Sequence, residues 1–222
     1  MIDVLRIVFL RDLKVSLRRW TDVLTSLILF VLVSLVFPLT LGNDSTMLLK
    51  IVGPVMLVSA LLANLLAMQN IFRPDVINGS LEQLTLSSYP LTWIICTKIF
   101  SFWFITSLPL LLISGFIASS YYVTGNSILI VILTLLLSTP SLVHISALAA
   151  ALTVAIRYPG ALMALIIIPL SLPIMIFGSK AIEFSISGID VSAPLYFLLG
   201  MMFFTCSLGP IVTASAIRIS ID

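Results

Sequence analysis

The sequence has few charged residues and many apolar ones. Only 9% of its 222 residues are charged and 60% are hydrophobic, whereas an ordinary soluble domain carries about 25% charged residues. A soluble fold of this size cannot hide so much apolar surface, because part of the surface of any folded chain stays wet. The formal net charge is only +2, so the sequence lacks the strong excess of positive charge typical of nucleic-acid-binding proteins. These numbers predict a membrane protein with no nucleic-acid partner.

Residues that perform catalysis are also scarce. There is one histidine, His144, and the two cysteines, Cys96 and Cys206, lie inside apolar runs as expected for small buried side chains. The sequence contains neither a G-x-x-x-x-G-K-[ST] motif nor an H-E-x-x-H motif, which argues against nucleotide hydrolysis and zinc chemistry. No paired carboxylates lie inside an apolar run, which argues against ion-coupled transport. We therefore expect no catalytic residues and no metal site in this chain.

Long apolar runs dominate the rest of the chain. Each of six runs is long enough to cross about 30 Å of hydrocarbon as a helix. The runs are residues 23–41, 48–70, 91–119, 127–156, 161–177 and 194–217. The sequence therefore predicts a single all-α domain, residues 1–222, with six transmembrane helices.

An amphipathic segment precedes the first run. Within residues 2–19, apolar side chains recur every fourth residue on one face, and basic side chains gather on another. This pattern is typical of a helix lying in the membrane interface. The alternative is a short soluble arm.

The positive charges predict the orientation. With the N-terminus in the cytoplasm, nine Lys and Arg residues lie inside or near the inner boundary, and only Lys50 and Lys180 lie outside. Cytoplasmic loops carry such an excess, and an even number of spans returns the C-terminus to the same side. Both termini are expected in the cytoplasm of a bacterial inner membrane, or in the matrix of a mitochondrion.

The densest polar stretch between the spans is residues 71–90, on the predicted cytoplasmic side. Asn78-Gly79 predicts a turn, Ser80 can cap a following helix, and Leu81 and Leu84 would share one face of that helix. Such a helix could insert into a groove on a soluble partner. An ordinary solvated loop is the alternative.

This stretch carries a family resemblance. Phe72-Arg73-x-Asp75 followed by Gly79-Ser80-Leu81-Glu82-Gln83-Leu84 resembles the cytoplasmic loop of the CcmB family, the permease-type subunit of the haem-handling ABC complex in System I cytochrome c maturation. The resemblance runs nearly end to end. It includes Phe37-Pro38-Leu39, Leu108-Pro109-Leu110 and the C-terminal Ala216-Ile217-Arg218-Ile219-Ser220.

The resemblance implies a set of partner subunits and places ATP hydrolysis in one of them. Members pair with a separate ATP-binding cassette subunit, usually two of each, and work with a haem-delivering membrane subunit and a periplasmic haem chaperone. ATP is then hydrolysed in the partner, to release the haem-loaded chaperone or, in an older view, to export haem. The fold implied is that of ABC-2-type exporters, with an interfacial N-terminal helix and a coupling helix between spans two and three.

Carried over to this sequence, the resemblance implies the residues that contact the ATPase. They are Arg73, Asp75, Gly79, Ser80, Leu81, Glu82, Gln83 and Leu84. His144 is a conceivable axial haem ligand, but a lone histidine in a helix bundle is more often hydrogen-bonded to a neighbouring helix. Residues 178–193 are expected to form the largest outer loop, either docking periplasmic partners or closing the bundle as a short interfacial helix.

Two other functions fit the composition. An ABC-2-type exporter subunit for another amphiphile, such as a lipid, would have the same helices and the same loop. A membrane scaffold that needs no nucleotide would have the helices but no ATPase partner.

Overall fold

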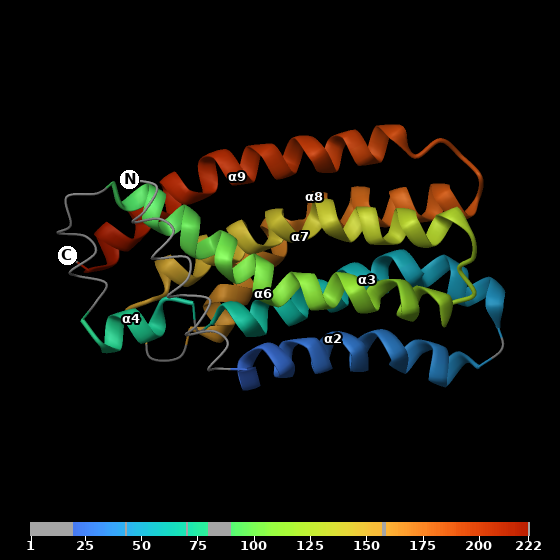
Figure 1. The fold of residues 1–222 in the computed structure, drawn as a ribbon, viewed down its shortest axis with the longest axis horizontal. Helices are drawn as coiled ribbons and strands as arrows, with labels where there is room; N and C mark the ends of the chain where they lie inside the picture. Colours follow the sequence, from blue (N-terminus) through green and yellow to red (C-terminus); the bar gives the residue numbers. More distant parts are fainter. Residues whose placement is uncertain (1–19, 43, 70, 80–89, 157–158, 222) are drawn as a thin grey trace.

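The computed structural model describes residues 20–42, 44–69, 71–79, 90–156 and 159–221, and within these ranges every regular element is a helix (Figure 1). The elements are α2 (Trp20–Leu41), α3 (Ser45–Met68), α4 (Arg73–Ile77), α6 (Leu91–Ser119), α7 (Asn126–Leu152), α8 (Gly160–Ile186) and α9 (Ser192–Ile221). The predicted interfacial helix at residues 2–19 lies outside the described residues.

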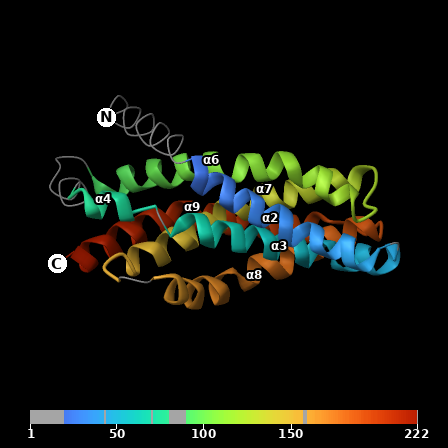
Figure 2. The same ribbon diagram turned by 90° about the horizontal axis from the view of Figure 1, so that it is seen from below.

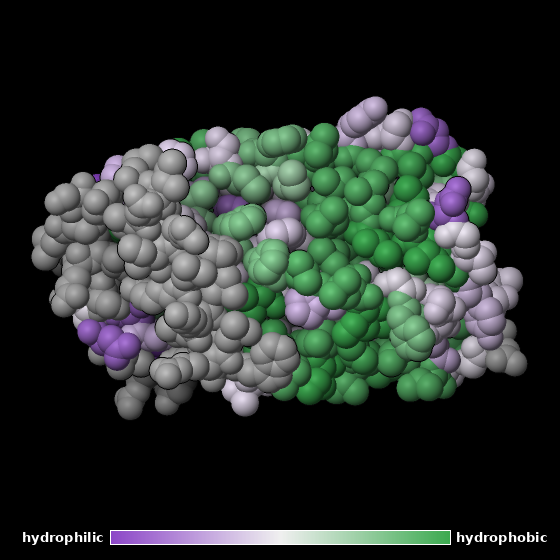
Figure 3. All heavy atoms as spheres, in the orientation of Figure 1, coloured by the Kyte–Doolittle hydropathy of each residue, from purple (hydrophilic) through white to green (hydrophobic). Residues whose placement is uncertain are grey.

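The six long helices confirm the predicted membrane protein. Each is long and apolar enough to cross a membrane. Their outward side chains are apolar as well: Leu112 and Phe116 of α6 are each 75% exposed. Figure 3 shows the resulting apolar band over the middle of the molecule, with polar residues toward its ends. Such a surface suits lipid and not water, because a soluble protein rarely exposes so large a continuous apolar area.

The helices run back and forth along one axis, with α3 and α7 at the centre (Figure 2). α7 contacts α3, α6, α8 and α9, whereas α2 packs mainly on α3. The core divides into two clusters of buried side chains. One includes Phe72, Leu91 and Ile217, near the end of the bundle that carries α4, and the other includes Leu48 and Val123, near the opposite end.

Most of the predicted helix boundaries differ from the structure by one residue or more, and three of these differences have a local explanation. α3 begins at Ser45, because Asp44 caps it. α7 ends at Leu152, where the amide of Thr153 donates to the Ala149 carbonyl at 3.2 Å and closes the last turn. Hydropathy alone marks the apolar run and not the hydrogen bonds that begin or end a helix, so such differences are expected.

The third difference corrects the predicted outer loop at 178–193. α8 continues nine residues past Phe177 to Ile186, so only residues 187–191 connect it to α9. Lys180 and Glu183 form an ion pair of 2.8 Å on the helix surface, so the polar residues here lie on a helix and not in a loop. Ser185 also donates to Ser127 of α7 at 2.9 Å. A docking role for this region stays a prediction, now for a shorter connection.

The cap at Asp44 makes a pH dependence testable. Its carboxylate accepts hydrogen bonds from the Thr46 hydroxyl at 2.7 Å and the Met47 amide at 3.1 Å, which lowers the pKa of Asp44 below its usual value. Because the folded-state pKa is the lower one, the cap contributes fully above the unfolded pKa of about 4 and is lost as pH falls through the folded value.

We therefore expect the Met47 amide to lose hydrogen-exchange protection as pH falls below about 4, relative to its own intrinsic exchange rate. The Asp44→Asn variant keeps an uncharged capping acceptor and should show no such change. If exchange of the Met47 amide depended on pH identically in the two proteins, the Asp44 carboxylate would not be the titrating cap.

Candidate functional site

The loop between α3 and α6 begins with a short helix held against the core. α4 has five residues, fewer than the roughly 12 that an isolated helix needs to be even marginally stable in water. Ile71 and Phe72, just before it, are 4% and 1% exposed and belong to the same packed cluster as Leu91 and Ile95 of α6. Tertiary contacts therefore position α4, and its own helical propensity does not.

A buried ion pair ties α4 to α6. Lys98 Nζ lies 2.5 Å from Asp75 Oδ2, and the two side chains are only 11% and 13% exposed. Lys98 is seven residues into α6. Side chains on a helix lean toward its N-terminus, so the ammonium group reaches back to the loop. Removing one partner of a buried pair typically costs about 3–5 kcal/mol, because the other charge is left uncompensated.

Gly79 makes the turn that the sequence predicts. Its φ is +65°, in the left-handed region that favours glycine, and its amide donates to the Val76 carbonyl at 3.1 Å. Asn78 precedes it and donates to the Pro74 carbonyl, which closes α4. The chain therefore leaves α4 through a sharp turn.

The structure describes three of the eight predicted contact residues. Arg73 is exposed, Gly79 forms the turn, and Asp75 is mostly buried with its carboxylate toward Lys98. The other five, Ser80, Leu81, Glu82, Gln83 and Leu84, lie outside the described residues. The helix predicted to follow Ser80 stays a prediction.

Sequence reasoning missed α4 itself and the role of Lys98. The signals for α4 were Pro74, in the first turn where a proline loses no hydrogen bond, and Asp75, where negative charge is favoured. No local pattern pointed from Asp75 to Lys98, because the pair joins residues 23 positions apart.

A hollow beside α4 opens next to Arg73. It has a volume of about 300 Å³, including the part open to solvent, and its floor includes the buried side chains of Phe72 and Met163. Gln69 and Arg73 border it on one side, and Thr153 and other residues around the α7–α8 joint border it on the other. The surface here combines an exposed guanidinium group with an apolar depression.

His144 is built into the packing of α7 against α9. Its Nδ1 lies 2.8 Å from the Pro140 carbonyl oxygen, so Nδ1 carries the proton and donates it. The ring covers Gly209, where an added Cβ would lie 2.8 Å from His144 Cδ2. Cys206 Sγ is 3.9 Å from Nδ1. The short hydrogen bond of His144 is thus to its own helix, and its contacts with Cys206 and Gly209 are to α9. The haem-ligand role stays a prediction.

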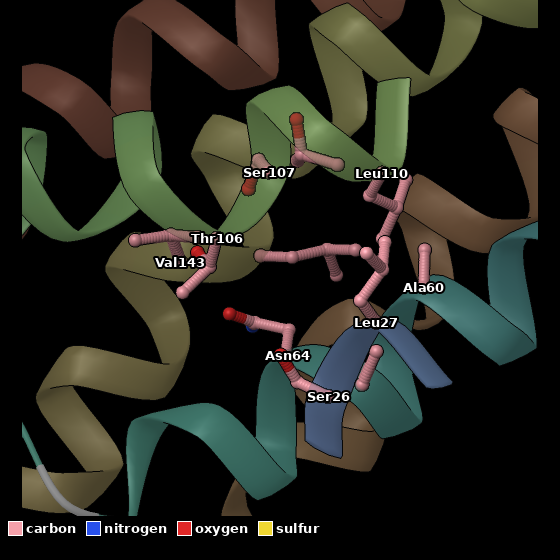
Figure 4. Close-up of a pocket in the computed structure, with 11 residues that line it drawn as sticks. Ser26, Leu27, Ala60, Asn64, Thr106, Ser107, Leu110 and Val143 are labelled. Carbon is pink, nitrogen blue, oxygen red and sulfur yellow. The ribbon is translucent and has the colours of Figure 1, made fainter. Parts of the chain in front are cut away.

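A second polar feature lies within the bundle, in a cavity of about 330 Å³ that is partly open (Figure 4). Polar residues of α2, α3, α6 and α7 line it: Ser26, Asn64, Thr106, Ser107 and Thr139. Asn64 Nδ2 donates to Ser146 Oγ at 2.7 Å. Its Oδ1 is buried and accepts no hydrogen bond from the described residues. The amide therefore links α3 to α7 with only one of its two polar atoms satisfied.

At Asn64 the cost of the unsatisfied acceptor exceeds the gain from the hydrogen bond, so we predict that Asn64→Leu does not destabilise the protein. The lost interhelical hydrogen bond is worth about 0.6 kcal/mol in a membrane, whereas an unsatisfied buried acceptor costs about 1–3 kcal/mol. We expect the thermal unfolding midpoint in detergent to stay level or rise. Thr106→Leu, at the same cavity, removes no unsatisfied acceptor and serves as the control. A clear fall for Asn64→Leu alone would show that Oδ1 has a partner.

Known proteins match the chain along its whole length. The family model described as CcmB protein matches residues 3–220. The chain belongs to the CcmB family. Proteins named Heme exporter protein B are similar to this CcmB chain in sequence and nearly equal to it in length. That of Haemophilus influenzae is 38% identical over 212 residues, which is 96% of each chain, and that of Pseudomonas aeruginosa is 34% identical over 221 residues. The Escherichia coli protein is 35% identical over 215 residues, or 97% of this chain and 98% of its own.

Membership in the CcmB family confirms the resemblance drawn from the loop motif. It also places α4, the Asp75–Lys98 pair and the six long helices in one matched region, because residues 3–220 include all of them except the last residue of α9.

Proposed function

We propose that this chain is the membrane subunit of an ABC-type complex that handles haem during cytochrome c maturation in a bacterial inner membrane. The observation that carries the proposal is the end-to-end CcmB match together with relatives of nearly equal length named for haem export. Those relatives come from bacteria, which favours the bacterial inner membrane over the mitochondrial one. Their name also favours haem over another amphiphile.

ATP hydrolysis would belong to a separate ATP-binding cassette subunit. The sequence contains no nucleotide-binding motif, and the loop offers a surface to receive such a partner. Leu81 and Leu84 would fill a groove on the ATPase, while Arg73 and Glu82 would set the register through charged contacts. The hollow beside Arg73 would offer the partner a further contact between α4 and the residues around the α7–α8 joint.

The proposed complex contains two copies of this chain and two ATPase subunits, with a haem-delivering membrane subunit and a periplasmic haem chaperone. In this arrangement the nucleotide cycle acts from the cytoplasm, and its product is release of the haem-loaded chaperone on the other side. The bias of nine basic residues against two supports a cytoplasmic loop and cytoplasmic termini. Consistent with this, α4 and the C-terminal end of α9, which carry Arg73 and Arg218, lie at one end of the bundle, and Lys98 pairs with Asp75 of α4. The start of α3 and the end of α8, which carry Lys50 and Lys180, lie at the other end (Figures 1 and 2).

Purification of the tagged chain from its own membranes in mild detergent tests the proposal. We expect an ATP-binding cassette protein to co-purify, and haem absorbance in the preparation to fall when ATP is added but not when a non-hydrolysable analogue is added. Deletion of the gene should also abolish c-type cytochromes. Intact c-type cytochromes would favour another amphiphile, and absence of any ATPase would favour a scaffold.

A further inference from the structure

The ion pair between Asp75 and Lys98 gives α6 a direct connection to the loop. Within the described residues, it is a buried charged contact between α4 and a long helix, and both side chains are almost nine-tenths buried. Asp75 therefore does not offer its carboxylate freely to a soluble partner in this conformation. The buried position of Asp75 indicates a role within the membrane subunit itself.

We propose that Lys98 is a positioning residue that latches the cytoplasmic loop to α6, so that a displacement of the loop moves the third span. This inference rests on the proposed function, because the displacement would come from the ATPase. Lys98 itself touches neither nucleotide nor haem in this scheme. It acts through Asp75.

Two further observations support a latch at this place. α4 is too short to stay helical alone, so its order depends on what holds it. Ile71 and Phe72 hold its N-terminal side in the core, and the ion pair holds its middle, three residues after Phe72. The left-handed turn at Gly79 then directs the chain away. Everything from Ile71 to Asp75 is thus fixed to the bundle, and Ser80, before the helix predicted to carry Leu81 and Leu84, is only five residues beyond Asp75.

The geometry also shows why a lysine suits the position. Lys98 is 9% exposed within an otherwise apolar stretch of α6, between Ile95 and Ile99, which are both fully buried. A charge at this depth is costly unless it is paired, and a flexible four-carbon stem can carry the ammonium group to a partner at the interface. Asp75 is that partner.

The chain provides a matched control pair. Lys180 and Glu183 form an ion pair of 2.8 Å on the surface of α8, but their side chains are 51% and 54% exposed and belong to the same helix. Loss of an exposed pair within one helix has a small effect. Lys180→Met therefore makes the same chemical change as Lys98→Met without breaking a contact between elements.

The first measurement is hydrogen exchange of the Val76, Asn78 and Gly79 amides, whose hydrogen bonds to Phe72, Pro74 and Val76 carbonyls form α4 and its turn. In purified complex, we expect Lys98→Met to speed this exchange at least about tenfold. Lys180→Met should leave it unchanged. The charge exchange Asp75→Lys with Lys98→Asp should restore at least part of the protection.

The second measurement is the amount of c-type cytochrome in cells that carry each variant. Lys98→Met should lower it severalfold while the ATPase still co-purifies, and the charge exchange should recover it. Unchanged exchange in Lys98→Met would overturn the latch, as would normal cytochrome levels beside faster exchange. If the wild-type chain captures no ATPase, the proposed function fails, whereas the exchange measurement still decides whether Lys98 holds the loop.

Discussion

Replacing both Leu81 and Leu84 with Asp should abolish capture of the ATP-binding subunit while the protein stays in the membrane. The two leucines share one face of the helix predicted after Ser80. Burying each leucine stabilises an interface by roughly 1.5–3 kcal/mol, and a carboxylate in the same apolar groove adds a desolvation cost. The sum exceeds about 4 kcal/mol, which weakens binding at least about a thousandfold.

The control for this variant adds the same charge without removing the apolar face. Leu86→Asp with Ser87→Asp places two carboxylates in the same segment, at residues outside the predicted contact set and off the predicted helix face that carries Leu81 and Leu84. We expect this protein to retain the ATPase in pull-down from detergent. Equal capture by the two double variants and the wild type would show that the ATPase binds elsewhere.

Replacing Gly53 with Leu should destabilise the packing of α3 against α8. Gly53 of α3 packs directly on the backbone of α8: an added Cβ would lie 3.0 Å from the Ser179 carbonyl oxygen and 3.1 Å from its Cα. Backbone cannot rotate away as a side chain can, so the two helices must separate. Overpacking of this kind costs about 1–3 kcal/mol, and leucine lies at the upper end because its whole side chain must be accommodated.

Gly200 provides the matched control for Gly53. It also lies inside a helix, α9, but an added Cβ there meets nothing within 4 Å. Gly200→Leu should leave the thermal unfolding midpoint in detergent level or slightly higher, because leucine has the better helix propensity. A similar fall for Gly53→Leu and Gly200→Leu would mean that α3 and α8 do not pack closely in the native protein.

The six spans could be predicted from hydropathy because the apolar runs are long and the turns between them are polar. The third span, predicted at 91–119, agrees with α6 at both ends. The fifth does not, because α8 continues past Gly178-Ser179-Lys180 to Ile186. Polar residues end an apolar run but need not end a helix, and the Lys180–Glu183 pair stabilises the extension on its surface.

Within the candidate site, only features formed by neighbouring residues in the sequence could be predicted. The turn at Gly79 follows from the Asn-Gly dipeptide, and its φ of +65° agrees. The pairing of Asp75 with Lys98 could not be predicted in this way, because it depends on how the start of α6 returns past α4. The same reason hid the contact between His144 and Gly209, which lie on different helices.

The side of the membrane on which residue 82 lies is the most direct test of the central claim, that a partner's nucleotide cycle acts on this subunit through the loop. A Glu82→Cys variant, with Cys96 and Cys206 replaced by Ser, can be treated with a membrane-impermeant maleimide. We expect labelling in inverted membrane vesicles and none in intact spheroplasts. Labelling in spheroplasts would place the loop outside, beyond the reach of a cytoplasmic ATPase.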